Sequence, residues 1–481
     1  MLHDWQSLLL LLISFLGYLL TLLLIPSLLM NKRKSSVSVV AWCMTIVLMP
    51  LVGSLFYLLF GINRVDRRTR SRQLSVERIG TRLPEWSQYD VLPGEEMNPQ
   101  HHCLAELGFR TGGNRPTQGN TVEIYAETSV TLQAIEDAVN QAKLTIHLEY
   151  YIWQPDETGR RLRDMLIKKA REGVKVRFLV DSLGSMRLKR VFLQPMLDAG
   201  IEVATFLPGQ SLRERWSVNL RSHRKIVVVD GQIGFTGGMN IGDEYLGRDP
   251  YLGYWRDTHL RLTGPSVLQL QQVFVEDWYF ATGIELLTKD IFPEPTELGD
   301  RTLQVIAGGP DQEQETFHTL YFSAINEAQA RICLATSYFV PTPALVMALE
   351  TAALRGVRVR ILLPQKSAHW LMVVSGRSYY ESLLESGVEI YEYTGGLLHS
   401  KTISIDGNWS LVGSPNFDAR SVQLNFEIGV ALFDASLALL LEEQFEKDSA
   451  TAVRIDLEAW RKRPLLHQLG EGFCRLFSPV L

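Results

Sequence analysis

The feature that most constrains the fold of this 481-residue chain is an internal repeat of helix and strand patterns. From residue 121 onward, amphipathic helix patterns alternate with short β-branched runs, and the succession occurs twice. Matching strings, GVKVR at 173–177 and GVRVR at 356–360, align the two copies. Because alternating helices cover the faces of mainly parallel sheets, we expect two α/β/α repeats, at 119–298 and 299–450.

Each repeat carries one copy of the pattern His-x-Lys-x-x-x-x-Asp. The copies consist of His223, Lys225 and Asp230, and of His399, Lys401 and Asp406. Strand side chains two positions apart share a face, so each imidazole is expected beside an ammonium group. Such a pair suits a phosphate: the imidazole can attack phosphorus while the lysine holds an oxygen. Two copies at equivalent points indicate one site at the seam between the repeats.

Small residues and an asparagine follow each motif. The strings are GGMN at 237–240 and GSPN at 413–416. Small residues let a backbone approach a phosphate closely. The amides of Asn240 and Asn416 and the hydroxyl of Ser414 can donate hydrogen bonds to it. We therefore expect these three side chains to bind phosphate.

One carboxylate lies in a strand-like stretch after each of these loops: Asp257 in YWRDTHLRL and Glu427 in LNFEIGVAL. A carboxylate there could accept a hydrogen bond from the second imidazole nitrogen and fix the tautomer of a reactive histidine. For Asp257, a surface ion pair with Arg256 is the open alternative. The prediction is that both carboxylates orient the histidines.

Two apolar runs, at about 8–30 and 37–60, precede the repeats. As helices they would each be about 35 Å long, enough to cross a bilayer. They predict a transmembrane hairpin over residues 1–62, and the arginines that follow favour a cytoplasmic body by the positive-inside rule. Residues 63–118 are polar and show no sustained periodicity, so a juxtamembrane connector is expected there.

Composition and the C-terminus narrow the classes further. The formal net charge of −5 disfavours a nucleic-acid partner. Four dispersed cysteines indicate neither a disulfide framework nor a zinc site. Residues 451–481 form a tail with apolar residues at helical spacing, namely Leu466, Leu469, Phe473, Leu476 and Phe477. This amphipathic tail could lie on a membrane or pack onto the body.

The paired motifs and their loops resemble the phospholipase D superfamily. Three features narrow the resemblance to bacterial cardiolipin synthases: the apolar hairpin ending in PLVGSLFYLLFGINR, the string from Ser414 to Glu427, and the ending near Trp460. The resemblance covers nearly the whole chain. It implies a multi-pass protein of the bacterial inner membrane whose partners are phosphatidylglycerol and other phospholipids. It leaves the oligomeric state open.

The resemblance also implies a two-step phosphatidyl transfer without metal or cofactor. His223 is the expected nucleophile and His399 the acid and base, although the pseudo-symmetry of the repeats leaves this assignment open. The aspartates Asp230 and Asp406 are expected to anchor their own loops. A membrane-bound hydrolase that makes phosphatidic acid, or a nuclease, would explain the motifs equally well.

Two further residues have open roles. Glu149 corresponds to a family position that borders the pocket, with ordinary strand pairing as the alternative. Arg420 could bind the phosphate of a second lipid or form a structural salt bridge with Asp418.

Overall fold

The computed structural model describes residues 2–30, 36–58, 65–84, 86–91, 97, 99–206, 220–296 and 299–476. The chain divides into two compact units, Met1–Arg68 and Thr69–Leu481. Both sequence repeats lie in the second unit.

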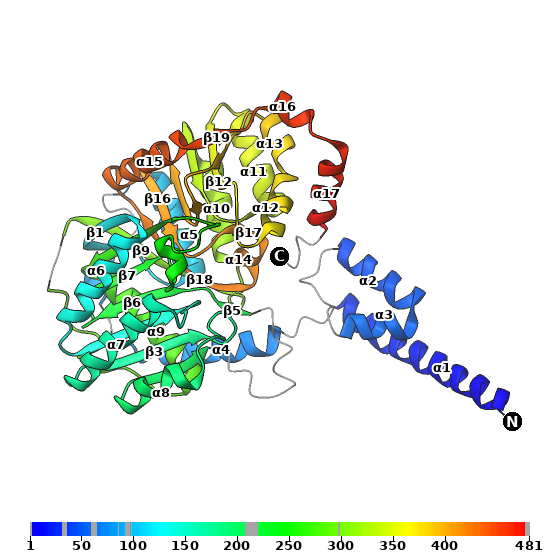
Figure 1. The fold of residues 1–481 in the computed structure, drawn as a ribbon, viewed down its shortest axis with the longest axis horizontal. Coiled ribbons are helices and arrows are strands. Elements are labelled where there is room, and N and C mark those ends of the chain that lie inside the picture. The colour runs from blue at the N-terminus through cyan, green and yellow to red at the C-terminus, as the bar shows by residue number, and fades with distance from the viewer. Residues whose placement is uncertain are drawn as a thin grey trace. The chain divides into compact units, whose positions relative to one another are not determined.

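The first unit contains the helices α1 (Leu2–Leu29), α2 (Ser36–Leu48) and α3 (Pro50–Phe56), drawn in blue in Figure 1. Met49 has a non-helical backbone (φ −130°, ψ 71°) and Pro50 starts α3, because a residue before proline is disfavoured in the helical region. The expected span 37–60 is therefore broken into two short helices. In the part of the chain that the structure describes, no helix combines the length and apolarity that crossing a bilayer requires. The two expected spans are thus not confirmed.

The expected connector contains regular structure: α4 (Val65–Gly80), the short helix η2 (Ser87–Tyr89) and α5 (Pro99–Gly112). Helix α5 packs against the second repeat with Leu104 buried. Gly108 permits the approach, since a Cβ there would lie 2.7 Å from Gln304 Oε1. Most residues of this segment are polar, so the narrow apolar stripe of α5 did not produce a clear helical pattern in the sequence.

The first repeat contains β1 (Thr117–Glu127), α6 (Thr128–Gln141), β2 (Thr145–Tyr150), α7 (Glu157–Arg171), β3 (Lys175–Asp181), α8 (Arg190–Asp198), β4 (Glu202–Phe206), β5 (Arg221–Ser222), β6 (Lys225–Val229), β7 (Ile233–Gly237), η3 (Asp243–Leu246), β8 (Trp255–Thr263) and α9 (Ser266–Thr282). Its strand order is β4-β3-β2-β6-β7-β8-β1. Helices cover the sheet, as Figure 1 shows in cyan and green.

The second repeat contains β9 (Arg301–Gly308), α10 (Thr316–Glu327), β10 (Arg331–Ala335), β11 (Phe339–Val340), α11 (Pro343–Leu354), β12 (Arg358–Pro364), α12 (Trp370–Arg377), α13 (Tyr380–Glu385), β13 (Glu389–Tyr393), β14 (Leu397–Leu398), β15 (Thr402–Ile405), β16 (Trp409–Gly413), β17 (Phe417–Asp418), α14 (Ala419–Gln423), β18 (Asn425–Leu432) and α15 (Ala435–Ala450). The tail adds β19 (Ala452–Arg454), α16 (Leu457–Arg461) and α17 (Leu465–Arg475). The strand order is β19-β13-β12-β10-β15-β16-β18-β9.

The predicted α/β repeats are confirmed, but the sheets are mixed rather than mainly parallel. Within the two sheets the runs β2-β3-β4 and β10-β12-β13 are parallel, whereas the motif strands β6 and β15 pair antiparallel with both neighbours. Each motif ends in an Asp-Gly pair with positive φ: Asp230 (52°) with Gly231 (63°), and Asp406 (52°) with Gly407 (65°). So short a turn joins only antiparallel neighbours, which explains the difference.

Strand pairing joins the two repeats. Strand β1 pairs with β8 and β9, β5 pairs with β18, and β14 pairs with β8. Through these pairings the strands of both repeats form one closed barrel. A large apolar cluster lies in each repeat, and Phe206 of β4 also contacts Phe426 of β18 across the seam. The short strands β5 and β14 each precede a motif histidine, so each histidine stands where its repeat meets the other.

Candidate active site

The first histidine is held by the second repeat. His223 follows β5, which runs parallel to β18, and its backbone N–H donates to Phe426 O at 2.8 Å. Its ring nitrogen Nδ1 lies 2.9 Å from Glu427 Oε2, and both side chains are buried. The carboxylate beside the first motif therefore comes from the second repeat.

The second histidine shows the reciprocal arrangement. His399 follows β14, which runs parallel to β8, and its backbone N–H donates to Arg256 O at 2.7 Å. Its Nδ1 lies 2.6 Å from Asp257 Oδ2. Arg256 makes its ion pair with Asp448 instead, so Asp257 is a buried partner of the ring and not a surface partner of Arg256. The two motifs exchange carboxylates across the seam.

The two carboxylates are held as anions. Burial alone would raise the pKa of Glu427, but His223 and Lys225 hold it below its ordinary value. Lys401 and His399 do the same for the pKa of Asp257 against the effect of its burial. Ser414 Oγ donates to Glu427 Oε2 at 2.5 Å, and Asn425 Nδ2 donates to Oε1 at 3.1 Å.

Burial sets the protonation of the histidines. It lowers the pKa of His223 to about 4, against the opposing effect of Glu427. It lowers the pKa of His399 to about 3, with Lys401 adding to the effect. Each imidazole is therefore neutral near pH 7. With Nδ1 facing a carboxylate, Nε2 is the nitrogen left to meet a substrate.

The two lysines are buried beside their histidines. Lys225 Nζ donates to His223 O at 2.6 Å, and Lys401 Nζ donates to His399 O and lies 2.9 Å from His399 Nδ1. Burial lowers the pKa of Lys225 to about 7 and that of Lys401 to about 8. The charge on Lys401 also lowers the pKa of Lys225, so the ammonium groups share one electrostatic environment. A phosphate between them would relieve this repulsion.

The aspartates of both motifs lie away from the imidazoles. Seven residues of extended chain separate His223 from Asp230, roughly 23 Å. The Asp230 carboxylate accepts from the backbone N–H groups of Lys143, Leu144 and Thr145 at 2.7–2.8 Å. Asp406 accepts from Gln329, Ala330 and Arg331 over the same distances. In each repeat the aspartate ties a hairpin to the start of a central strand.

The two asparagines are hydrogen-bonded within the protein. Asn240 Oδ1 accepts from Ile152 N at 3.1 Å, and its Nδ2 donates to the Tyr245 hydroxyl at 2.7 Å. Asn416 Oδ1 accepts from the Ser337 hydroxyl at 2.6 Å. These contacts hold the loops that follow β7 and β16.

The two residues with open roles are placed as follows. Glu149 is buried and accepts from the Ser222 hydroxyl at 2.5 Å, one residue before His223, and burial raises its pKa well above the ordinary value. Asp418 Oδ1 caps α14 by accepting from Ser421 N at 2.7 Å. Arg420 lies in that helix. Burial raises the pKa of Asp418 to about 7, and the nearby charge of Arg420 opposes this rise.

Sequence reasoning missed the residues that support the first motif from behind. Arg224, between the motif His and Lys, forms an ion pair with Asp277 of α9. Arg72 of α4 also reaches Asp277, at 2.8 Å, and pairs with Asp311. An arginine in a buried strand requires a carboxylate partner, so Arg224 within the first motif was the sequence feature that could have predicted this ion pair. Aromatic rings also contact the histidines: Tyr151 lies against His223, and Trp255 and Tyr245 against His399.

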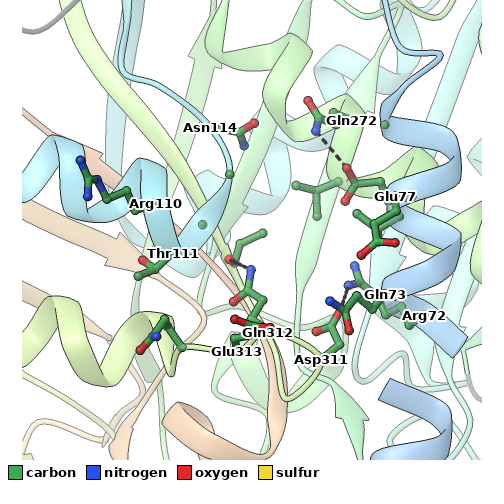
Figure 2. A pocket seen from close by; sticks show the side chains of 18 of the residues that line it. Arg72, Gln73, Glu77, Arg110, Thr111, Asn114, Gln272, Asp311, Gln312 and Glu313 are labelled. Carbon is green, nitrogen blue, oxygen red and sulfur yellow. Dashed lines mark hydrogen bonds and ion pairs between the residues drawn. The ribbon is translucent and has the colours of Figure 1, made fainter. Parts of the chain in front are cut away.

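A cavity of about 790 Å³ adjoins this ion-pair cluster. Figure 2 shows Arg72 and Asp311 facing each other at one part of its wall, with Asn114 and Gln272 lining another part. Arg224 also lines it, so the cavity meets the first motif on the side that Arg224 faces. Among the described residues, no group of three or more His, Cys, Asp or Glu side chains is placed to hold a metal ion.

The comparisons with known proteins agree with this arrangement. A family model described as the cardiolipin synthase, phospholipase D-like domain matches residues 135–278 and 321–449. A second, described as the phospholipase D-nuclease N-terminal domain, matches residues 19–61. The first model thus matches once in each repeat.

Similar proteins and structures point the same way. A cardiolipin synthase of Geobacillus sp. (strain WCH70) is 40% identical over 456 residues, which cover 94% of this chain and 90% of that protein. Cardiolipin synthase 2 of Bacillus anthracis is 38% identical over 92% of this chain and 86% of its own length. The solved structure of phosphatidylserine synthase from Haemophilus influenzae Rd KW20 shares the fold, with a TM-score of 0.58 over 79% of this chain and 98% of that one, at 16% identity.

The family resemblance expected from the paired motifs is therefore confirmed. Both repeats match one family model, and the similar proteins extend over nearly the whole chain. The chain belongs to the cardiolipin synthase family of phospholipase D-like proteins.

Proposed function

We propose that this protein is a cardiolipin synthase, a phosphatidyltransferase that converts two phosphatidylglycerol molecules into cardiolipin and glycerol. The observation that carries the proposal is the reciprocal pairing of each motif histidine with a carboxylate of the other repeat. Two buried, neutral imidazoles beside two ammonium groups suit an anionic phosphodiester and a reaction with a covalent intermediate. Family membership supports phosphatidylglycerol as the substrate.

In the first step, Nε2 of His223 attacks the phosphorus of one phosphatidylglycerol. The bond from phosphorus to the headgroup glycerol oxygen breaks, and that oxygen takes a proton from Nε2 of His399. The products are phosphatidyl-His223 and free glycerol. Because His399 is neutral in the free protein, this step requires proton uptake when the lipid binds. The anionic phosphodiester favours uptake by raising the pKa of the adjacent ring.

In the second step, His399 takes a proton from a headgroup hydroxyl of a second phosphatidylglycerol. The hydroxyl oxygen attacks phosphorus, the phosphorus–nitrogen bond breaks, and cardiolipin leaves with His223 restored. The second step frees His223 and returns the proton to His399, so the same two steps can run in reverse. The acid of one step is the base of the next, which a neutral ring of adjustable pKa can provide.

The remaining predicted residues have supporting roles. Lys225 and Lys401 hold the phosphoryl oxygens, where negative charge increases in the transition state. Glu427 and Asp257 orient the rings, with Ser414 holding Glu427 in place. Asn240 and Asn416 contribute to phosphate binding by shaping the loops beside it. We assign Asp230 and Asp406 to the scaffold rather than to chemistry.

Lipid substrates place the protein at a membrane. We propose the cytoplasmic membrane of a bacterium, with residues 69–481 on the cytoplasmic side, as the arginines after the second apolar run favour. Protease access in vesicles of the two orientations tests the side: residues 69–481 should be cleaved in inside-out vesicles and protected in right-side-out ones.

The decisive assay for the reaction uses the purified full chain in detergent micelles with phosphatidylglycerol as the sole lipid. We expect cardiolipin and glycerol in equal amounts. Phosphatidic acid as the main product would contradict the proposal and identify a hydrolase. The double variant His223→Ala/His399→Ala sets the background.

A further inference from the structure

Helix α17 packs against the body with its polar side. Arg463, just before the helix, forms an ion pair with the buried Glu471 at 2.9 Å. Cys474 is buried on the same side, and the Arg475 guanidinium lies 4.7 Å from the centre of the Tyr379 ring. The helix thereby packs on α12, and Figure 1 shows it in red at the outer edge of the second repeat. These contacts fix its rotation.

That rotation turns the apolar side of α17 outward. Five large apolar residues lie within about 100° of the helical circumference, opposite Glu471 and Cys474. Their exposed fractions are between 59% and 80%: Leu465, Leu466, Leu469, Phe473 and Leu476. A surface helix ordinarily buries such a face, so a contiguous exposed stripe marks an interaction surface.

The charge around this stripe selects the partner. Residues 461–476 contain four Lys or Arg residues and one acidic residue, Glu471, which is buried and paired. The segment has a formal net charge of +3; Arg461 is paired with Glu385 and Arg463 with Glu471, so Lys462 and Arg475 supply the positive charge beside the stripe. A basic, amphipathic helix with an outward apolar stripe fits an anionic lipid surface.

The stripe lies on the same body as the active site. Trp370, the first residue of α12, is 66% exposed. Its neighbour His369 contacts the Tyr338 ring edge-on, at 6.0 Å between centroids. Tyr338 precedes β11, which pairs with β17 directly after Asn416. Helix α12, which begins at Trp370, thus contacts both α17 and β11, whose partner β17 follows the second motif loop.

We propose that the outward stripe of α17, with Trp370 beside it, docks into an anionic phospholipid bilayer and presents the active site to its lipid substrates. This inference deepens the proposed function, because the choice of a bilayer as partner rests on lipid substrates. The stripe inserts its five apolar side chains at the level of the acyl chains, while Lys462 and Arg475 remain with the headgroups.

A lipid-contact measurement on the full chain tests docking without using activity. In a Cys43→Ser/Cys103→Ser background, a bimane label is attached at Leu469→Cys. The matched control carries the label at Leu440→Cys on α15, a leucine that is 52% exposed. In phosphatidylglycerol vesicles with brominated acyl chains, we expect quenching at 469 at least fivefold greater than at 440. Equal quenching at both positions would overturn the proposal, as would protection of 469 by a second copy of the chain.

An activity measurement then links docking to the site. The variant Leu469→Glu/Phe473→Glu should make cardiolipin in vesicles at least tenfold more slowly than the unmodified chain, and within twofold of it in detergent micelles. The control Leu439→Glu/Leu440→Glu should match the unmodified chain in both. An equal loss in vesicles and micelles would overturn a docking role. Quenching without cardiolipin synthesis would refute the function and leave docking standing, whereas cardiolipin synthesis without quenching would refute docking alone.

Discussion

In the first repeat, the loop after the motif hairpin passes Asp257 with a glycine, Gly238, whereas the second repeat has Ser414 at the equivalent position beside Glu427. A Cβ at Gly238 would lie 2.2 Å from Asp257 Oδ1, so no side chain fits there. Ser414 instead donates to Glu427. The backbone at Gly238 approaches Asp257 closely and positions that carboxylate. The hydroxyl of Ser414 positions the longer side chain of Glu427.

Elsewhere the two half-sites are alike. Both motif aspartates have a φ of 52° and accept three backbone N–H groups each. Both histidines follow a short strand paired with the opposite repeat. The shared features belong to the scaffold, and the differences lie beside Asp257 and Glu427, the carboxylates of the two histidines, for which we propose different roles. The predictions below test this division.

The largest effect is expected from removing either histidine. Because one shared site needs both rings, His223→Ala and His399→Ala should each lower the rate of cardiolipin formation by about 10³-fold or more. The rate is measured with phosphatidylglycerol in micelles. If each repeat were a complete site, either variant would keep about half of the activity. That result would contradict a single site shared by the two repeats.

Exchanging the small residues should have unequal effects. Gly238→Ser forces the Asp257 carboxylate away from His399, and we expect kcat to fall by about 100-fold. Ser414→Gly removes one hydrogen bond to Glu427, which corresponds to about tenfold or less. Steady-state kinetics on both variants give the comparison. Equal losses would show that the two positions have the same role.

The lysines should set an alkaline limit on activity. The pKa of Lys225 is lowered to about 7 and that of Lys401 to about 8, so both ammonium groups lose protons as the pH rises through this range. We expect kcat/KM to fall above pH 7–8, by up to about tenfold per pH unit for each lysine that loses its proton.

Replacing one lysine identifies its contribution to this limit. Lys225→Arg keeps its positive charge at alkaline pH, so the fall in kcat/KM should begin at a higher pH. A profile that is flat up to pH 10 would contradict the role of the ammonium groups.

The smallest effect on chemistry is expected at the motif aspartates. Asp230→Ala and Asp406→Ala each leave three backbone N–H groups without their acceptor and place alanine at a positive φ. We expect a loss of about 1–3 kcal/mol in the free energy of unfolding and a change in kcat of no more than about threefold. Chemical denaturation and kinetics on the same samples separate the two quantities. A large loss of kcat in a stable variant would show that these aspartates take part in the reaction.

The sequence was sufficient to predict the repeats, the strands and the residues around the histidines, because these depend on periodicity and on motif spacing. It did not predict the exchange of carboxylates, since Glu427 and His223 are 204 residues apart and meet only through the pairing of β5 with β18. The antiparallel motif strands were missed, although the Asp-Gly pairs at 230–231 and 406–407 carried the signal.

Other misses have different physical causes. The apolar stripe of α5 is too narrow to stand out in a polar segment. The outward rotation of α17 depends on its packing against α12 and on the contact of Arg475 with Tyr379, and periodicity shows that a helix has two faces without showing which one is buried. The break at Met49 follows from Pro50, because a residue before proline is disfavoured in the helical region, although proline is tolerated in helices that are embedded in lipid.

The account's central claim is that each histidine is oriented by the carboxylate of the other repeat. It is tested most directly by mass spectrometry of the covalent adduct formed from a phosphatidyl ester with an activated leaving group, which needs no acid. In Asp257→Asn the phosphatidyl adduct should form on His223 and persist, because His399 can no longer serve as the base. In Glu427→Gln the adduct should hardly form. An adduct on His223 that is lost in Asp257→Asn and retained in Glu427→Gln would contradict the exchange.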